Sequence, residues 1–231
     1  MLTYEECKRV KNIDKESGRV YDTPIGFFPS VTTVLGQTGN KEWLKQWIER
    51  VGKEEADRIK NAAAERGTIL HDYLERFYEE YPAPTFEEAK NFVLTSGLTQ
   101  EKVFIQKMVK SLLKHLLANN FKSVSQEFVV WDAELELAGR CDGLGYWNSK
   151  LIVVDYKTSL RKKSRANIED YLLQATAYCR AHNQMFKNQV EAFAILIAIE
   201  DGTSQIFTGL YKNYESKLID RVNQYKGMYD K

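Results

Sequence analysis

Three charged side chains stand near each other in the chain, where two strands are expected. Asp155 and Lys157 follow the apolar run LIVV, and Asp142 stands 13 residues before Asp155. Because strand side chains alternate between faces, Asp155 and Lys157 share one face, whereas Val154 and Tyr156 take the other. A hairpin between the two strands would bring Asp142 and Asp155 close enough to share a cation.

Paired carboxylates are how a protein holds Mg²⁺ or Mn²⁺, because these hard cations prefer oxygen ligands. A lysine beside them can orient or deprotonate a water, or stabilise charge on a phosphate. The alternative is structural: a strand-end ion pair for Asp155 and Lys157, and a turn aspartate before glycine for Asp142. The context Gly139-x-x-Asp142, followed after 12 residues by Asp155-x-Lys157, favours the metal site. Composition, periodicity and spacing by themselves support only a metal-dependent site of carboxylates and a lysine.

The elements that must position these residues follow from the hydrophobic pattern. Strands are expected at 123–131, 135–146 (interrupted near Gly143), 150–157, 190–199 and 203–210, the last two joined by the turn Asp201-Gly202. Helices are expected at 41–52, 54–80, 100–119, 168–184 and 213–229, after a hairpin of Lys8–Ile13 with Arg19–Thr23. This order predicts an α/β fold with a mixed central sheet flanked by helices.

The chain has 231 residues, 43% of them hydrophobic, and a formal net charge of +1. No linker or repeat interrupts it, so we expect one domain over 1–231, with an N-terminal hairpin and helical part (1–120) and an αβ core (121–231). The balanced charge argues against non-specific coating of nucleic acid but allows a local basic groove. No apolar run approaches a membrane span, and the first 20 residues resemble neither a signal peptide nor a transit peptide. These features predict a cytoplasmic protein without a membrane partner.

Further motifs identify a resemblance to a known family. The chain resembles the PD-(D/E)xK nuclease superfamily in its RecB-like branch, most closely the group of mitochondrial genome maintenance exonucleases with their phage and bacterial relatives. The resemblance extends from about Pro29 to Asn183. It rests on Asp155-x-Lys157 and on three more segments in the same order as in the family: Pro29–Leu35, Arg66–His71 and Gln174-x-x-x-Tyr178. It implies a restriction-endonuclease-like core with an N-terminal helical part.

The resemblance also implies roles for individual residues. The metal ligands would be His71, Asp142, Asp155 and the backbone carbonyl of Tyr156, with Lys157 as the catalytic lysine. Glu127 corresponds to a recurrent strand glutamate of the branch, and is either the hydrogen-bond partner of a ligand or simply a charged strand residue. The implied cofactor is Mg²⁺ or Mn²⁺.

A set of polar residues is expected to contact DNA. Gln174 and Tyr178 share one helix face, so they either approach the phosphate backbone or form a polar cap beside a buried tyrosine. Ser30 and Thr32 either contact phosphate or cap the helix after them. The other expected contacts are Arg66, Arg140, Thr158, Ser159 and the basic run Arg161, Lys162 and Lys163.

The activity that the resemblance implies is an Mg²⁺- or Mn²⁺-dependent exodeoxyribonuclease acting on free ends of single-stranded DNA, in repair, replication or recombination. The alternatives are a double-strand-specific exonuclease or endonuclease of the same fold, an inactive DNA-binding module, and a structural adaptor. Cys7, Cys141 and Cys179 are too few and too scattered for the four-cysteine iron–sulfur cluster of some branch members. Without a Walker A motif the chain is not a fused helicase-nuclease. The missing targeting segment favours a bacterial or phage protein, in the bacterial cell or in the host cytoplasm.

Overall fold

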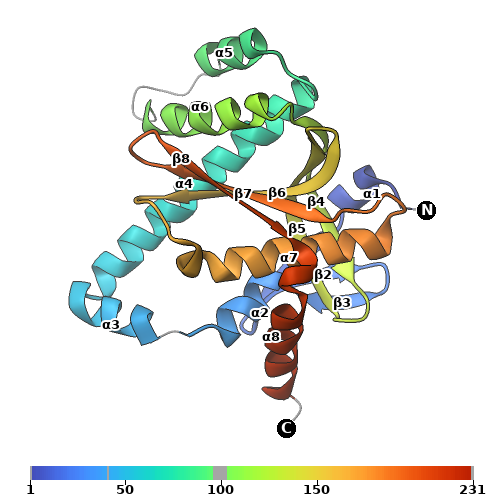
Figure 1. The fold of residues 1–231 in the computed structure, drawn as a ribbon. Helices are drawn as coiled ribbons and strands as arrows, with labels where there is room; N and C mark the ends of the chain where they lie inside the picture. The colour runs from blue at the N-terminus through green and yellow to red at the C-terminus, as the bar shows by residue number, and fades with distance from the viewer. Residues whose placement is uncertain (1, 41, 96–102, 230–231) are drawn as a thin grey trace.

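The computed structural model describes residues 2–40, 42–95 and 103–229 (Figure 1). The elements run in the order α1 (Tyr4–Lys8), β1 (Lys11–Lys15), β2 (Gly18–Thr23), β3 (Gly26–Pro29), α2 (Val31–Thr38), α3 (Glu42–Val51), α4 (Lys53–Glu80), α5 (Phe86–Thr95), α6 (Val103–Ala118), β4 (Lys122–Asp132), β5 (Leu137–Trp147), β6 (Lys150–Ser159), η2 (Arg165–Ile168), α7 (Glu169–Met185), β7 (Ala192–Ile199), β8 (Ser204–Leu210), η3 (Tyr211–Asn213) and α8 (Glu215–Gly227).

The centre of the molecule is a five-stranded sheet in the order β4-β5-β6-β7-β8. Neighbouring strands are antiparallel except β6 and β7, which pair in parallel with Asp155 opposite Ile195. Parallel neighbours need a crossover, and α7 provides it. The α/β class with a mixed, helix-flanked sheet is therefore confirmed.

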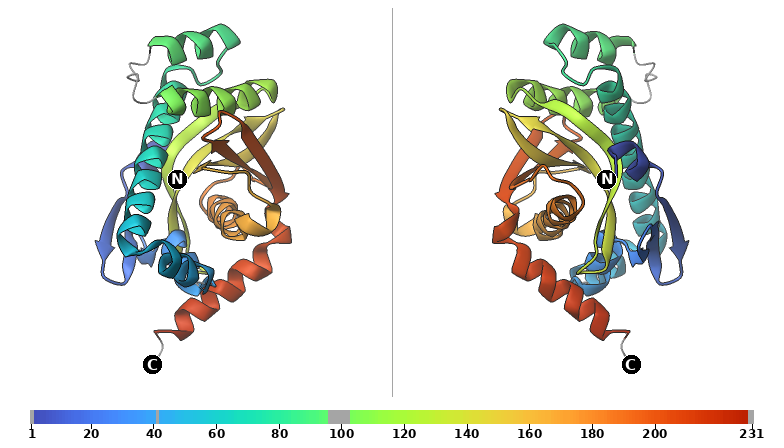
Figure 2. Two further views of the ribbon diagram at one scale, coloured as in Figure 1. Left: turned by 90° about the vertical axis from the view of Figure 1, so that its left-hand side faces the viewer. Right: turned by 90° about the vertical axis from the view of Figure 1, so that its right-hand side faces the viewer.

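Two apolar clusters lie on opposite faces of this sheet. Val153 belongs to the cluster that includes residues of α2, α7 and α8, whereas Val154 and Tyr156 belong to the cluster built with α4, α5 and α6. Figure 2 shows α4 and α6 on one side of the sheet and α7 on the other. The alternation predicted for β6 is thus present, and it directs Asp155 and Lys157 to the α7 face.

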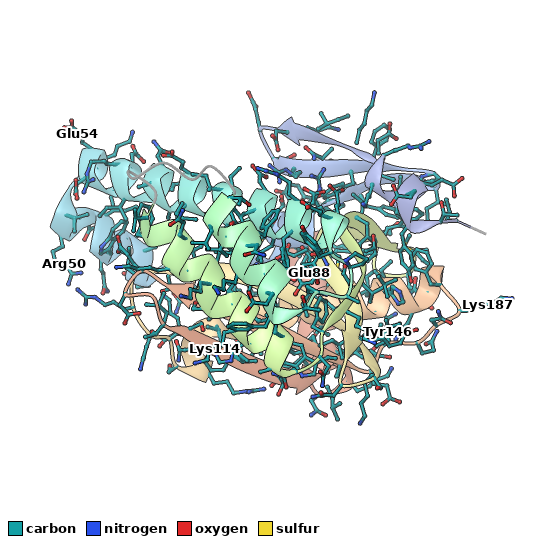
Figure 3. The ribbon with its side chains drawn as sticks, turned by 90° about the horizontal axis from the view of Figure 1, so that it is seen from above. Arg50, Glu54, Glu88, Lys114, Tyr146 and Lys187 are labelled. Carbon is teal, nitrogen blue, oxygen red and sulfur yellow. The ribbon has the colours of Figure 1, made fainter. Side chains whose placement is uncertain are left out.

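Helix α4 spans 28 residues and carries His71 in its second half. Its buried side chains are concentrated in its second half, from Leu70 to Tyr78, and only Ala56 is buried in the first half. Gly52, at φ +86°, separates α4 from α3. Arg50 and Glu54, which flank this junction, lie at one extreme of the molecule (Figure 3). The second half of α4 therefore anchors the helix and fixes His71 against the sheet.

The N-terminal part contains a second, three-stranded sheet in the order β1-β2-β3. Lys8 lies in α1 rather than in the predicted first strand, and the hairpin continues to Lys15. The predicted break in β5 near Gly143 is wrong, because the strand runs on to Trp147. A Cβ at Gly143 would lie 2.6 Å from Val154 Cγ2, so this glycine makes room for packing rather than a turn.

Other boundaries agree with expectation to within a few residues, although residues 100–102 of the helix expected at 100–119 lie outside the described residues. None of the helices over the described ranges is long and apolar enough to cross a membrane. The expected single domain stays a prediction, to which the packing of α2, α4 and α6 against the central sheet lends support.

Candidate active site

One cavity of about 220 Å³ lies where α4, α7 and the N-terminal sheet meet β4, β5 and β6. Its walls include many of the residues singled out in the sequence, from segments far apart in the chain. The lining consists of Arg19, Tyr21, Ser30, Val31, Thr32, His71, Glu127, Gly139, Arg140, Asp142, Lys157, Gln174 and Tyr178.

The imidazole of His71 is held at both nitrogens. Nδ1 lies 3.0 Å from Glu127 Oε1, and Nε2 lies 2.9 Å from the carbonyl oxygen of Tyr156. Asp142 Oδ2 lies 3.8 Å from Nε2 and accepts a 2.7 Å hydrogen bond from the backbone N–H of Tyr156. The four groups thus converge on one point beside β6.

Glu127 approaches His71 from an unusual backbone conformation. Its φ is +49°, the left-handed region, although it lies inside strand β4. A non-glycine residue in this region is uncommon and costs on the order of 1 kcal/mol. Such strain is typical of functional sites, where surrounding contacts hold the residue in place. Of the two roles left open for Glu127, the contact with His71 favours that of a ligand's partner.

Buried Asp155 and partly exposed Lys157 form an ion pair on β6. Lys157 Nζ donates to Asp155 Oδ1 at 2.8 Å and lies 5.4 Å from the centre of the Tyr171 ring. Asp155 is fully buried, and its Oδ2 has no hydrogen-bond partner. Burial raises the pKa of Asp155 to about 7, although the Lys157 ammonium opposes this and Asp142 adds to it. An unpartnered buried carboxylate oxygen needs a cation or a donor to satisfy it.

The donor set fits a divalent cation. Ligand atoms of His71, Glu127 and Asp142 lie within 4.8 Å of one another, and the free oxygen of Asp155 is a further potential donor from the neighbouring strand. Oxygen-rich sites with one imidazole suit Mg²⁺ or Mn²⁺. The compact group of three potential ligands thus contains Glu127 beside His71 and Asp142, and Asp155 lies outside it. Burial lowers the pKa of His71, but the Asp142 and Glu127 carboxylates outweigh it and raise that pKa to about 9.

Tyr178 packs on β5 only because residue 139 is a glycine. A Cβ at Gly139 would lie 2.6 Å from the Tyr178 ring. Gln174, one turn earlier on α7, donates to the Tyr178 hydroxyl at 2.8 Å. Both side chains are buried and both line the cavity, so the predicted pair from one helix face is brought against the predicted carboxylate strand.

Of the remaining predicted DNA contacts, Ser30 and Arg140 line the cavity and the others do not. Ser159 is buried and donates to the Arg161 carbonyl at 2.6 Å, which gives it a structural role in the turn after β6. Ser30 lines the cavity and its Oγ caps α2 by accepting from Thr33 N–H at 3.0 Å, so its helix-capping alternative is present. The residues that do not line the cavity are Arg66, Thr158, Ser159, Arg161, Lys162 and Lys163.

Sequence reasoning missed Arg19 and Tyr21 as cavity residues, whereas Thr32, considered with Ser30 as a helix cap or a phosphate contact, does line the cavity. No spacing rule connects Arg19 or Tyr21 with a strand more than 100 residues later, because the link is made only by tertiary packing.

Comparison with known proteins agrees with this geometry. A profile described as the PD-(D/E)XK nuclease superfamily matches residues 40–225. Mitochondrial genome maintenance exonuclease 1 from Xenopus tropicalis is 28% identical over 222 residues, covering 87% of this chain and 58% of the relative. The protein of the same name from Homo sapiens is 26% identical, covering 85% of this chain and 58% of the relative. The chain thus spans less than two thirds of the length of these curated relatives. Since the family profile covers most of the chain and the carboxylates, histidine and lysine meet in one cavity, the chain belongs to the PD-(D/E)XK nuclease superfamily.

Proposed function

We propose that this protein is a divalent-metal-dependent exodeoxyribonuclease that removes nucleotides from free ends of single-stranded DNA. One observation carries the chemical part of the proposal. His71, Glu127 and Asp142 converge in the cavity that Lys157 also lines, and Asp155 beside Lys157 has a buried oxygen without a partner. This set can hold a metal next to a fixed positive charge, which is what phosphodiester hydrolysis requires.

The residues that would hold Mg²⁺ or Mn²⁺ are His71, Asp142, Asp155 and the Tyr156 carbonyl, with Glu127 bonded to His71. When bound, the metal would lower the pKa of a water and stabilise charge on the phosphate. Burial lowers the pKa of Lys157, but Asp155 and Asp142 outweigh this and raise it above its ordinary value. Lys157 therefore stays an ammonium, so it orients the attacking water or stabilises the phosphate rather than acting as a base.

The substrate class is supported less directly. The two relatives described above are named exonucleases, which favours cleavage from ends. Gln174 and Tyr178 line the same cavity as Lys157, which supports a contact of both with the DNA backbone. Exposed Arg161 and Lys162 lie in the loop that follows β6, the strand that carries Lys157, and would favour a nearby DNA backbone. A role in DNA repair, replication or recombination and a cytoplasmic location in a bacterial or phage system stay predictions from the sequence.

The proposal is tested with end-labelled single-stranded oligonucleotides, linear and circular, in Mg²⁺, Mn²⁺ or EDTA. We expect metal-dependent laddering of the linear strand, no cleavage of the circle, and more than a tenfold loss of rate in Asp155→Ala and Lys157→Ala. Lys187→Ala, at a loop residue outside the cavity, is the control. Activity above a tenth of the parent would remove Asp155 or Lys157 from the catalytic set.

Two results would favour the alternatives. Cleavage of circles would indicate an endonuclease, and faster digestion of duplex ends would indicate a double-strand exonuclease. DNA binding without cleavage in any metal would indicate an inactive binding module.

A further inference from the structure

The cavity has a second wall whose charge is opposite to that of the metal-ligand set. Arg19 from β2 and Arg140 from β5 both line it. We propose that Arg19 and Arg140 form a subsite for a phosphate of the DNA strand next to the one that is cleaved. This inference rests on the proposed function and adds to it the residues that place the strand.

Arg19 is held rigidly at its backbone. Its N–H donates to Thr33 Oγ1 at 3.0 Å, and its carbonyl accepts from Ser30 N–H at 2.8 Å. A Cβ at Gly18 would lie 2.4 Å from the Thr33 side chain, so β2 and the start of α2 are in close contact. The guanidinium meets Asp14 through Nε at 3.0 Å, an exposed contact of little energetic weight. The backbone of Arg19 is thus fixed in the wall, and its side chain, which also contacts Tyr21, can turn its remaining donors toward a phosphate.

Arg140 is exposed, and among the described residues no carboxylate lies within ion-pair distance of it, although its charge opposes the rise in the pKa of nearby Glu75. Its strand is joined to the start of α2 by a bridge between Ala138 and Ser30. Arg140 and Asp142 are two residues apart on β5, which corresponds to about 7 Å along a strand. That is comparable to the distance between successive phosphates of an extended single strand. If one phosphate of the strand lies beside Asp142, the next phosphate would therefore lie near Arg140.

Tyr21 lines the same cavity as the two arginines. Its side chain is buried, and burial raises its pKa, whereas the positive charges of Arg140 and Arg19 oppose that rise. Both guanidinium groups thus add positive charge to this part of the cavity, which favours an anion there. Guanidinium is the side chain best suited to bind phosphate oxygens in pairs. A phosphate in this position would satisfy both.

The test measures binding of a fluorescently labelled single-stranded oligonucleotide in EDTA, over a range of salt concentrations. Arg19→Ala and Arg140→Ala should each weaken binding several-fold and reduce the slope of log affinity against log salt by about 0.7. Arg140→Lys should keep the slope, because it keeps the charge. Lys187→Ala, a basic residue beyond the C-terminal end of α7, should change neither quantity. Unfolding curves for each variant show whether the fold is retained.

A second experiment locates the phosphate. One neutral methylphosphonate linkage is moved along the oligonucleotide, one position at a time. A linkage next to the cleaved bond should weaken binding to the parent but not to Arg140→Ala. Unchanged slopes in folded variants, or a coupled linkage far from the cleavage point, would overturn the subsite. Binding in EDTA needs no catalysis, so the two proposals can fail separately. If the parent never cleaves DNA but Arg19→Ala and Arg140→Ala still bind it more weakly than the parent does, the proposed function is overturned and the subsite stands.

Discussion

At the scale of single residues, the site depends on charged groups held in apolar surroundings. Asp155 is fully buried, with one oxygen bonded to Lys157 and the other without a partner. An unsatisfied buried polar group costs about 1–3 kcal/mol, and more if charged. A protein shaped for stability alone would replace it with an apolar side chain. Its presence next to Lys157 and Asp142, which both line the cavity, therefore indicates a function that needs the free oxygen.

His71 gives the first residue-level prediction. His71→Ala removes the imidazole between Glu127 and the Tyr156 carbonyl, so we expect at least a tenfold rise in the Mn²⁺ concentration needed for half-saturation. Glu127→Gln should weaken Mn²⁺ binding by a smaller factor than His71→Ala does. Loss of a hydrogen-bond partner of a metal ligand typically lowers metal affinity by about 10- to 100-fold. Electron paramagnetic resonance of free Mn²⁺ measures both without any turnover.

His115 provides the control, since it lies on α6 outside the cavity. His115→Ala should bind Mn²⁺ as the parent does. If His71→Ala also binds as the parent does, His71 is a structural residue and its contacts with Glu127 and Tyr156 serve the fold.

The sequence could predict those site residues that lie close together in one strand or helix, because their spacing places them on the same face. Asp155 and Lys157 share a strand face, and Gln174 and Tyr178 share a helix face, so local geometry alone places each pair. His71 and Glu127 needed the family resemblance, because nothing in the sequence shows that α4 crosses β4 at that point. Arg19 was beyond reach, because the N-terminal sheet meets β5 only through tertiary packing.

At the scale of elements, the contact between α7 and β5 depends on Gly139. Gly139→Ala would force a Cβ to within 2.6 Å of the Tyr178 ring, so the ring or the strand must move. Overpacking of this kind costs about 1–3 kcal/mol. We expect lower stability in urea unfolding and a reduced cleavage rate, because Asp142 lies three residues further along the same strand.

Gly36 is the matched control, because a Cβ added there meets nothing within 4 Å and the residue lies inside α2. Gly36→Ala should leave cleavage unchanged and stabilise the protein by up to about 1 kcal/mol. Equal stabilities for Gly139→Ala and the parent would show that Tyr178 can move without loss.

The elements that sequence analysis missed are short. Helices α1 and α5 each begin with a Thr-x-x-Glu pair, Thr3 with Glu6 and Thr85 with Glu88, whose side chains and backbone N–H groups bond reciprocally. These capping boxes were visible signals of a helix start. Strand β3 has only four residues, and its place is set by pairing with β2 rather than by its own pattern.

At the scale of the whole molecule, distant segments hold the cavity walls together. Arg221 of α8 donates through Nε to Thr38 Oγ1 at 2.6 Å and through Nη2 to the Leu35 carbonyl at 2.5 Å, both in α2. Figure 1 shows α8 descending from the sheet to lie beside α2. Helix α8 thus fixes α2, the helix that begins at the cavity with Ser30.

His182 makes the stability of the whole molecule depend on pH. It is fully buried on α7, lies 3.1 Å from the Tyr4 hydroxyl, and stacks on Phe186. Burial lowers its pKa to about 4. The unfolded chain, with an ordinary histidine pKa near 6.5, therefore binds more protons between pH 4 and 6.5. The stabilisation is complete above about pH 6.5 and is lost as the pH falls toward 4, in total on the order of 3 kcal/mol.

His182→Phe keeps an aromatic ring at this position and removes the titrating group. We expect the free energy of unfolding of the parent, measured in urea and EDTA, to fall more steeply than that of His182→Phe between pH 6.5 and 4.5. Asp155 and His71 also titrate, but they are common to both proteins, so the difference isolates His182. Tyr4→Phe removes only the hydrogen bond and should keep the parent's pH dependence. Parallel curves for the parent and His182→Phe would contradict this prediction. They would mean that His182 gains its proton without a loss in the free energy of unfolding, because the contact between α1 and α7 opens in acid before the core does.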